Sequence, residues 1–351
     1  MTTTADLPTT ADLPTFTVIS GEQVAATLEG GEADVVALVR ETYLLHEAGR
    51  TVNPPSYFLR FEDRPASRII ALPASIGAGS PVDGIKWISS VPSNVDRGIP
   101  RASAVTILND PVSGYPYACL ESSIISAVRT AASAALAAQV LLAGRPGPVR
   151  LGVVGGGIIA RYVHHYLLAS GVEVAAAGVH DLSSAHARAF AGYLERAAPS
   201  TPVTVHDEVA DLVRSSDLVV LATVAPEPYL TDVALFAHHP VVLNVSLRDL
   251  GTDVVLSAVN VVDDVEHVLK AGTSVHLTEQ RTGDRAFLAG TLAQVLQGDV
   301  EVPADRTVVF SPFGLGVLDL AVAKHVHDTL AAAGALVPVP GFFHEMSRTG
   351  S

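Results

Sequence analysis

A glycine-rich turn at Gly155-Gly156-Gly157, with Ala160 three residues further on, constrains the fold of this chain more than any other feature. The turn follows the apolar run Val149–Val154 and precedes a helical pattern, which predicts a strand, a sharp bend and a helix. In this arrangement Gly155 permits the bend, Gly157 lets the backbone approach a pyrophosphate, and Ala160 keeps the helix close to the strand. N–H groups at the helix N-terminus then face the phosphates, so the segment predicts a dinucleotide site.

An acidic residue, Asp181, stands 24 residues after Gly157, at the end of the next apolar run. A carboxylate in that place can accept hydrogen bonds from both ribose hydroxyls and repels a 2′-phosphate, so NAD is favoured over NADP. One alternative is a packing turn in an α/β domain that binds no nucleotide. Another is that Asp181 only shapes its own turn.

Apolar β-runs alternate with helical segments through the second half of the chain. Such alternation predicts the α/β class, with a Rossmann-type, doubly wound parallel sheet that helices cover on both faces. Six strands are expected, at Val149–Val154, Val172–Val179, Thr201–Val205, Leu218–Ala222, Val241–Val245 and Val259–Val262.

The first half has a different texture, with short β-runs and turn residues between Pro54 and Glu121. This pattern predicts an α+β domain for substrate binding and dimerisation, completed by a returning helix at Gly316–Gly334. The expected strands are Phe16–Ser20, Ser56–Phe61, Arg68–Leu72, Gly84–Ser89 and Ala104–Leu108, with a turn at Asn109–Gly114. One helix is expected to begin at Glu22, a second to end at Gly49, and a third to span Ser122–Ala143. The predicted domains are a disordered tail at residues 1–14, the substrate and dimerisation domain at 15–130 with 317–351, and the NAD-binding domain at 131–316.

Composition limits the possible partners and surroundings. A formal net charge of −14 argues against nucleic acid or an anionic membrane as partner. The single cysteine, Cys119, excludes a disulfide framework and fits the cytoplasm. No signal peptide or membrane span is expected, because the most apolar long stretch, Ile124–Leu142, carries Arg129 and Gln139. The thirteen histidines lack metal-ligand spacing, so no metal is expected.

Between residues 84 and 133 several short motifs follow one another: Gly84-Ile-Lys86, Pro92-Ser-Asn94, Gly98-Ile-Pro100, Gly114-Tyr-Pro116 and Arg129-Thr130-Ala-Ala. This series resembles the ornithine cyclodeaminase/μ-crystallin family, whose members carry G-x-K, P-x-N, G-L-P, T-G-x-P and a helical R-T-A-A in that order. The similarity continues to Phe310-Ser-Pro-Phe-Gly-Leu-Gly and Asp319, and so covers nearly the whole chain.

Within that family, several stretches are most similar to the dehydrogenases of 2,3-diaminopropionate biosynthesis in siderophore and peptide-antibiotic pathways. These stretches include Ile85-Lys-Trp-Ile-Ser-Ser, Asn94-Val-Asp-Arg-Gly, Ser246-Leu-Arg-Asp249-Leu and His276-Leu-Thr-Glu-Gln. The resemblance implies oxidation of N-(2-amino-2-carboxyethyl)-L-glutamate with NAD, which releases L-2,3-diaminopropionate and 2-oxoglutarate. It also implies a homodimer formed through the first domain, and a PLP-dependent synthase that supplies the substrate.

The chain departs from the cyclodeaminase pattern at three places. Leu247-Arg248 stands where the family has Gly-Gly before its acid, and Ser311-Pro312 stands where it has Asp-Ser. Ala71, ahead of Pro73, replaces an acidic residue. These changes argue against ornithine cyclisation, although an ornithine cyclodeaminase or an alanine-type dehydrogenase stays an alternative. A μ-crystallin-like protein that binds ligand without catalysis is the alternative from another class.

Matching family positions imply roles in carboxylate binding. Arg60, Lys86 and Arg129 would hold the substrate carboxylate, with Arg68 as the substitute for Arg60. Small neighbours at helical spacing predict that Arg129 points inward. An unpaired Lys86 in an apolar strand would be costly, so a bound anion is its expected partner. For Arg60 the alternative is a surface salt bridge.

Asp249 follows the run Val241–Val245, at the carboxyl end of a parallel strand, where doubly wound sheets bind ligands. It matches the family's catalytic acid, which implies a general base that activates water after hydride transfer; Lys86 is the second expected catalytic residue. The alternative for Asp249 is a cap on the next helix. Further contacts are expected from Thr223 and Ala225 at the nicotinamide ribose, Thr130 at the phosphates, and Arg281 and Lys270 at the extra carboxylates.

Overall fold

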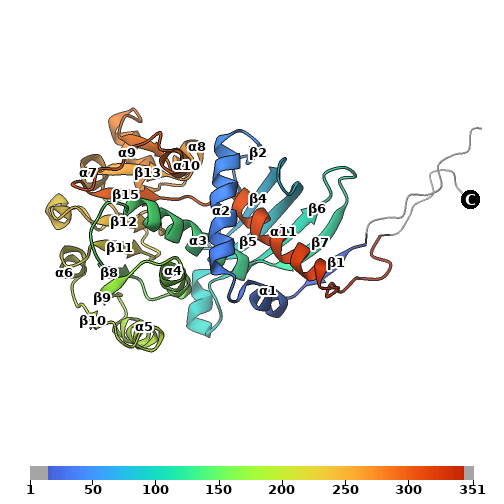
Figure 1. The fold of residues 1–351 in the computed structure, drawn as a ribbon, viewed down its shortest axis with the longest axis horizontal. Coiled ribbons are helices and arrows are strands. Elements are labelled where there is room, and N and C mark those ends of the chain that lie inside the picture. Colours follow the sequence, from blue (N-terminus) through green and yellow to red (C-terminus); the bar gives the residue numbers. More distant parts are fainter. Residues whose placement is uncertain (1–14, 344–351) are drawn as a thin grey trace, which may run out of the picture.

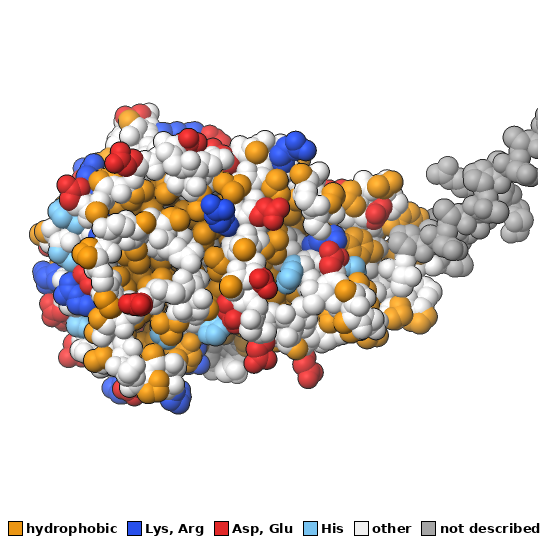
Figure 2. Space-filling view, in the orientation of Figure 1, with side chains coloured by type: hydrophobic (Ala, Val, Ile, Leu, Met, Phe, Trp, Pro, Cys, Tyr) orange, Lys and Arg blue, Asp and Glu red, His pale blue; other side chains and the backbone are white. Residues whose placement is uncertain are grey.

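The computed structural model describes residues 15–343, which form two sheets with helices packed between and around them (Figure 1). The expected tail at residues 1–14 lies outside the described residues, and so do the last eight residues of the expected first domain. Figure 2 shows acidic, basic and apolar side chains interspersed over one face of the molecule. On that face no large patch carries a single sign of charge.

The first sheet has the strand order β1-β7-β6-β5-β4-β2, with β3 paired to β4. It is antiparallel except for β1, which runs parallel to β7. Two of its strands, β2 and β7, are missing from the sequence expectation, because one has two residues and the other begins with proline. The strands are β1 (Thr17–Ile19), β2 (Thr51–Val52), β3 (Tyr57–Arg60), β4 (Arg68–Ile76), β5 (Val82–Ser90), β6 (Ala102–Asn109) and β7 (Pro116–Glu121).

Among residues 15–343, helices cover one face of this sheet and leave the other open. The covering helices are α1 (Gly21–Leu28), α2 (Glu32–Glu47), α3 (Ser123–Leu141) and α11 (Gly316–Ala332), the last being the expected returning helix. Because side chains alternate along a strand, Lys86 is buried under the helices while its neighbour Trp87 is 43% exposed. Val105, directly opposite Trp87 on β6, is 39% exposed.

The second sheet is parallel throughout, in the order β10-β9-β8-β11-β12-β15-β13-β14. This is the expected Rossmann-type fold. Two strands beyond the expected six complete it: β14, which contains Gly290, and β15, which is followed at once by Pro312, so glycine or proline interrupts each pattern. The strands are β8 (Val149–Val154), β9 (Val174–His180), β10 (Val203–Val205), β11 (Leu218–Leu221), β12 (Val241–Asn244), β13 (Val259–Val262), β14 (Leu288–Thr291) and β15 (Val308–Ser311).

Seven further α-helices and two 3-10 turns belong to the described residues. The helices are α4 (Ile158–Ala169), α5 (Ser184–Ala197), α6 (Val209–Arg214), α7 (Thr252–Ser257), α8 (Val265–Val268), α9 (Ser274–Thr282) and α10 (Leu292–Gln297). The 3-10 turns are η1 (Pro92–Arg97) and η2 (Val233–Phe236).

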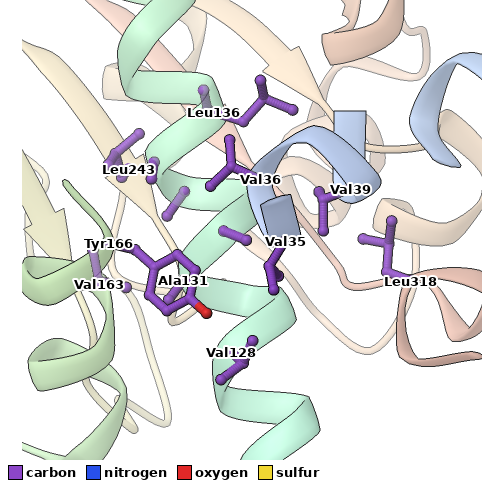
Figure 3. Close-up of a cluster of buried hydrophobic side chains, with 14 of the residues drawn as sticks. Val35, Val36, Val39, Val128, Ala131, Leu136, Val163, Tyr166, Leu243 and Leu318 are labelled. Carbon is purple, nitrogen blue, oxygen red and sulfur yellow. The ribbon is translucent and has the colours of Figure 1, made fainter. Parts of the chain in front are cut away.

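The long helix α3 lies between the two halves of the molecule (Figure 1). Its residues Val128, Ala131 and Leu136 belong to one core with Val36 of α2 and Leu243 of β12 (Figure 3). By length and composition α3 could cross a membrane, but 67% of its most apolar window is buried inside the fold. The expected domain boundary between residues 130 and 131 falls inside this continuous helix.

A polar junction also connects the two halves. Asp264, before α8, lies 3.0 Å from His46 Nε2 of α2 and 2.8 Å from His267 Nδ1. On its other side His267 Nε2 lies 2.8 Å from the Asn53 amide nitrogen. Although burial opposes ionisation, hydrogen bonds from both histidines hold the pKa of the Asp264 carboxyl well below its usual range. The junction therefore holds a carboxylate between histidines of both halves.

Candidate active site

The glycine-rich turn lies between β8 and α4, as expected. Gly155 has φ of 92°, and a Cβ there would lie 2.6 Å from the carbonyl oxygen of Ala222. Gly156 packs on α5, where a Cβ would lie 2.9 Å from Phe190 Cβ. Gly157 is the N-cap of α4 with an ordinary φ of −78°, and a Cβ there would meet no described atom within 4 Å. The open side of Gly157 at a helix N-terminus fits the approach of a pyrophosphate.

Asp181 ties the end of β9 to this turn. Its Oδ2 accepts the N–H of Gly156 at 2.9 Å, and its Oδ1 accepts the N–H of Ser183 at 2.8 Å. Ala160 is buried against the sheet, so α4 lies close to it. A carboxylate thus stands beside the glycine turn, in the position expected for ribose recognition.

A buried charge cluster joins β5, α3 and α11. Lys86 Nζ lies 2.6 Å from Asp319 Oδ2, and Arg129 Nε lies 3.1 Å from Asp319 Oδ1. The side chains of Lys86 and Asp319 are 2% and 0% exposed. The inward direction expected for Arg129 is found. Lys86 also has a partner within the chain that the sequence did not indicate, Asp319, because α11 places a carboxylate over the sheet. Two cations share one carboxylate, so the cluster keeps a net positive charge.

The environment of Lys86 lowers the pKa of its ammonium group. Burial lowers the pKa of Lys86 to about 8, although the Asp319 carboxylate acts against this shift. The nearby Arg129 charge adds to the lowering. Lys86 therefore changes charge within an ordinary experimental pH range.

The loop before α11 is shaped around Arg129. Asp263 accepts the N–H groups of Phe313 at 2.9 Å and Gly314 at 2.6 Å. Gly314 has φ of 94°, and a Cβ there would collide with the Arg129 guanidinium. The backbone angle favours glycine at this position, and the Arg129 guanidinium occupies the space that a Cβ would take.

Asp249 is fully buried at the carboxyl end of β12. Its Oδ1 accepts hydrogen bonds from Thr223 Oγ1 at 2.5 Å and from the Tyr229 hydroxyl at 2.9 Å, and its Oδ2 accepts one from Ser246. Burial and the Asp249 charge raise the pKa of Tyr229, which stays a protonated donor. The N-cap of α7 is Gly251, so the helix-cap alternative for Asp249 is wrong. Asp249 instead forms the centre of a group of hydroxyls.

The structure separates the remaining binding candidates. Ala225 donates its N–H to Thr223 Oγ1 at 3.2 Å, which joins both residues to the Asp249 group. Thr130 lies beside Arg129 on α3, and its hydroxyl bonds within the helix. Arg281 forms an exposed ion pair with Asp253 at 2.7 Å, so that cation already has a partner.

Arg60 and Arg68 lie opposite each other on β3 and β4, outside the buried cluster. The Arg60 guanidinium lies 5.1 Å from the centre of the Phe58 ring, and no carboxylate of residues 15–343 forms the surface salt bridge considered for it. Lys270 follows α8, and its positive charge acts on the pKa of His267. No three His, Cys, Asp or Glu side chains within residues 15–343 are placed to hold a metal ion.

Sequence reasoning missed Asp319 and Tyr229 as site residues. Asp319 carried a usable signal, since a single acid among apolar helix residues at 316–323 calls for a buried cation partner. Tyr229 lies in the loop after β11, and its contact with Asp249 depends on how two loops pack.

Comparison with known proteins places this geometry in a family. The chain is 28% identical over 301 residues to N-((2S)-2-amino-2-carboxyethyl)-L-glutamate dehydrogenase of Staphylococcus aureus, covering 84% of this chain and 89% of that protein. The crystal structure of CmnK superposes with a TM-score of 0.85 at 29% identity, over 95% of this chain and all of the other. An archaeal alanine dehydrogenase dimer with bound NAD shares the fold, with a TM-score of 0.82, 23% identity, and 93% and 99% coverage. A model of the ornithine cyclodeaminase/mu-crystallin family matches residues 23–334, and the chain belongs to that family.

Proposed function

We propose that this chain oxidises N-(2-amino-2-carboxyethyl)-L-glutamate with NAD, to give L-2,3-diaminopropionate and 2-oxoglutarate. The observation that carries the proposal is the buried, net-positive cluster of Lys86, Asp319 and Arg129, in a chain that also has the Asp249 hydroxyl group and the dinucleotide turn. The name of the S. aureus relative supports the choice of substrate.

The chain is an NAD-dependent oxidoreductase that acts on a CH–NH bond, as expected from its sequence. Bound NAD supplies the hydride acceptor. In the proposal Gly155, Gly157 and Ala160 shape the pyrophosphate turn and Asp181 binds the ribose. Thr130 is proposed to contact the phosphates.

Substrate binding is proposed at Lys86 and Arg129. Their shared Asp319 carboxylate fixes both cations before substrate arrives, so a second carboxylate enters a prepared site. The bound carboxylate then holds the neighbouring Cα–N unit of the glutamyl part in one orientation. This placement supplies proximity for oxidation.

The proposed reaction also requires the transfer of protons and the addition of a water molecule. Oxidation removes a hydride from Cα and the proton from the amine, which leaves a C=N bond. Water adds to that carbon, and the C–N bond then breaks to form the ketone of 2-oxoglutarate and the free amine of diaminopropionate. Asp249 is proposed to take the proton from the attacking water and return it to the departing amine. Hydroxyls of Ser246 and Tyr229 keep its oxygens oriented.

We also propose an oligomeric state and a metabolic role for the chain. The open face of the first sheet, around Trp87 and Val105, is proposed as a homodimer interface, and the alanine dehydrogenase of the same fold is a dimer. A PLP-dependent synthase in the cytoplasm would supply the substrate. The diaminopropionate would serve siderophore or peptide-antibiotic assembly.

The test is NADH absorbance on mixing the purified chain with NAD and N-(2-amino-2-carboxyethyl)-L-glutamate, with alanine and ornithine in parallel. We expect NADH with the glutamate conjugate alone, together with equal amounts of 2-oxoglutarate. NADH from alanine would favour the alanine-type dehydrogenase, since Lys86 and Arg129 could hold the single carboxylate of alanine. Proline and ammonia from ornithine would indicate a cyclodeaminase, and tight binding without turnover would indicate a binding protein.

A further inference from the structure

Three arginines line one end of the first sheet. Arg60 of β3 lies directly opposite Arg68 of β4, and Arg68 lies directly opposite Ser90 of β5. Arg101, immediately before β6, donates from Nη1 to Ser90 Oγ at 2.7 Å. Because directly opposite residues project from the same face of a sheet, Arg60 and Arg68 share a face.

That face is the one that carries Lys86. Lys86 and Ser90 are four residues apart on β5, so both project to the same side, about 13 Å apart along the strand. The arginines therefore lie along the strand from the buried charge cluster, on the helix-covered side of the sheet.

A fourth arginine comes from the second half of the chain. Arg248, the residue before Asp249, donates to the carbonyl oxygens of Gly272 at 2.5 Å, Pro226 at 3.2 Å and Ala271. A guanidinium has five N–H groups, so two of them remain available within the described part of the chain. The backbone carbonyls hold this cation in place and leave it able to bind an anion.

Three neighbouring guanidinium groups act electrostatically on Arg68. Burial lowers the pKa of Arg68, and three neighbouring charges lower it further: those of Arg101, Arg60 and Arg248. Within residues 15–343 none of the four forms an ion pair with a carboxylate, although the chain as a whole has an excess of acids. Like charges held together in this way favour an anion as their partner.

We propose that Arg248, Arg68 and Arg101, with Arg60 at the rim, form a second subsite for carboxylates of the substrate. It would hold the carboxylates away from the oxidised carbon, while Lys86 and Arg129 hold the one beside it. This inference rests on the proposed function, whose substrate carries three carboxylates. It makes the arginines the residues that select polycarboxylic over monocarboxylic amino acids.

The experiment is calorimetric titration of wild-type, Arg248→Gln and Arg68→Gln proteins, each saturated with NADH. In the presence of NADH the ligands are 2-oxoglutarate and 2-oxopentanoate, which lacks the second carboxylate. In a separate titration without nucleotide the ligand is N-(2-amino-2-carboxyethyl)-L-glutamate. Both variants should bind at least one of the polycarboxylates about 10- to 100-fold more weakly, because each loses a charged hydrogen bond, and should bind 2-oxopentanoate as wild type does. Arg214→Gln, which removes an exposed arginine paired with Asp211, is the matched control and should change nothing.

Unchanged affinity of both variants for both polycarboxylates would overturn the subsite, even if wild type oxidises the glutamate conjugate. Equal weakening of 2-oxopentanoate binding would also overturn it, since the arginines would then act on the whole site. Retained 2-oxopentanoate binding shows that a variant is folded. If wild type fails to oxidise the conjugate while the arginine variants lose dicarboxylate affinity, the proposed function is wrong and the subsite stands.

Discussion

The two buried acids of this site differ in the partners that they accept hydrogen bonds from. Asp249 accepts from three hydroxyls, whereas Asp319 accepts from two cations. Hydroxyls add no charge, so within residues 15–343 no cation pairs with the Asp249 carboxylate, whereas Asp319 lies between two cations and suits a positioning role. The two buried acids therefore have different expected roles, and their sequence neighbourhoods agree: Asp249 follows a strand, whereas Asp319 lies among apolar helix residues.

Replacing Asp249 with asparagine tests the proposed base. Asp249→Asn keeps the shape of the side chain but removes its capacity to take a proton, so kcat for the glutamate conjugate should fall by about 100-fold or more. NAD affinity, measured by titration, should change little. Ser246→Ala removes one donor and should have a much smaller effect. Full turnover by Asp249→Asn would contradict the assignment.

The pH dependence of inhibitor binding tests Lys86. Since burial lowers the pKa of Lys86 to about 8, the fraction that carries a positive charge falls as the pH rises through that value. The Ki of 2-oxoglutarate, which has no amine to titrate, should therefore rise above pH 8 by up to about tenfold per pH unit. Lys86→Arg stays charged and should lack this rise. A wild-type Ki that is constant from pH 7 to 10 would exclude this role of Lys86.

Helices, strands and turns with a strong residue pattern could be predicted from the sequence, and those with a weak pattern could not. The turn between β8 and α4 was predictable because glycine spacing and flanking periods constrain a few consecutive residues. The four-residue strands β14 and β15 were not, since their place in the sheet comes from pairing with β13 and β12. The position of β14 and β15 in the strand order is set by these neighbours, which the local sequence does not record.

Two glycines of the turn should respond differently to alanine. Gly155→Ala places a Cβ 2.6 Å from the Ala222 carbonyl at φ of 92°, so the free energy of unfolding should fall by about 1–3 kcal/mol. Gly157→Ala meets no described atom and has an allowed φ, so stability should stay within about 0.5 kcal/mol while NAD affinity falls. Denaturant unfolding and NAD titration of both variants separate the effects. Unchanged NAD affinity of Gly157→Ala would remove that residue from the proposed pyrophosphate site.

At the scale of the whole molecule, the site is assembled from distant parts of the chain. Lys86 and Asp319 are 233 residues apart, and Arg129 and Asp319 are 190 apart. The returning helix α11 closes this separation by packing on the first sheet and on α3. No described helix covers the opposite face of the sheet, which is the basis of the proposed dimer.

The proposed dimer has a direct test in molar mass. Trp87→Glu and Val105→Glu place a charge on the open face of the first sheet, so each should convert a dimer into a monomer in sedimentation experiments. Leu256→Glu on α7 is the matched control, because Leu256 is 39% exposed, as Val105 is, but lies in the other half. A wild-type monomer, or a dimer that survives both substitutions, would show that this face is not the interface.

Residue types and periods were enough to predict the glycine-rich turn, the parallel α/β second half, the β-rich first half and the returning helix. These features depend on residue types and periods over a few consecutive residues, where backbone geometry limits the choices. Only the packed fold shows that Lys86 pairs with Asp319, that Asp249 accepts from hydroxyls of two loops, and that Arg60, Arg68 and Arg101 line one end of the first sheet. Such contacts depend on how separate elements pack, and packing is set by the sum of many weak, non-local interactions that no short stretch of sequence contains.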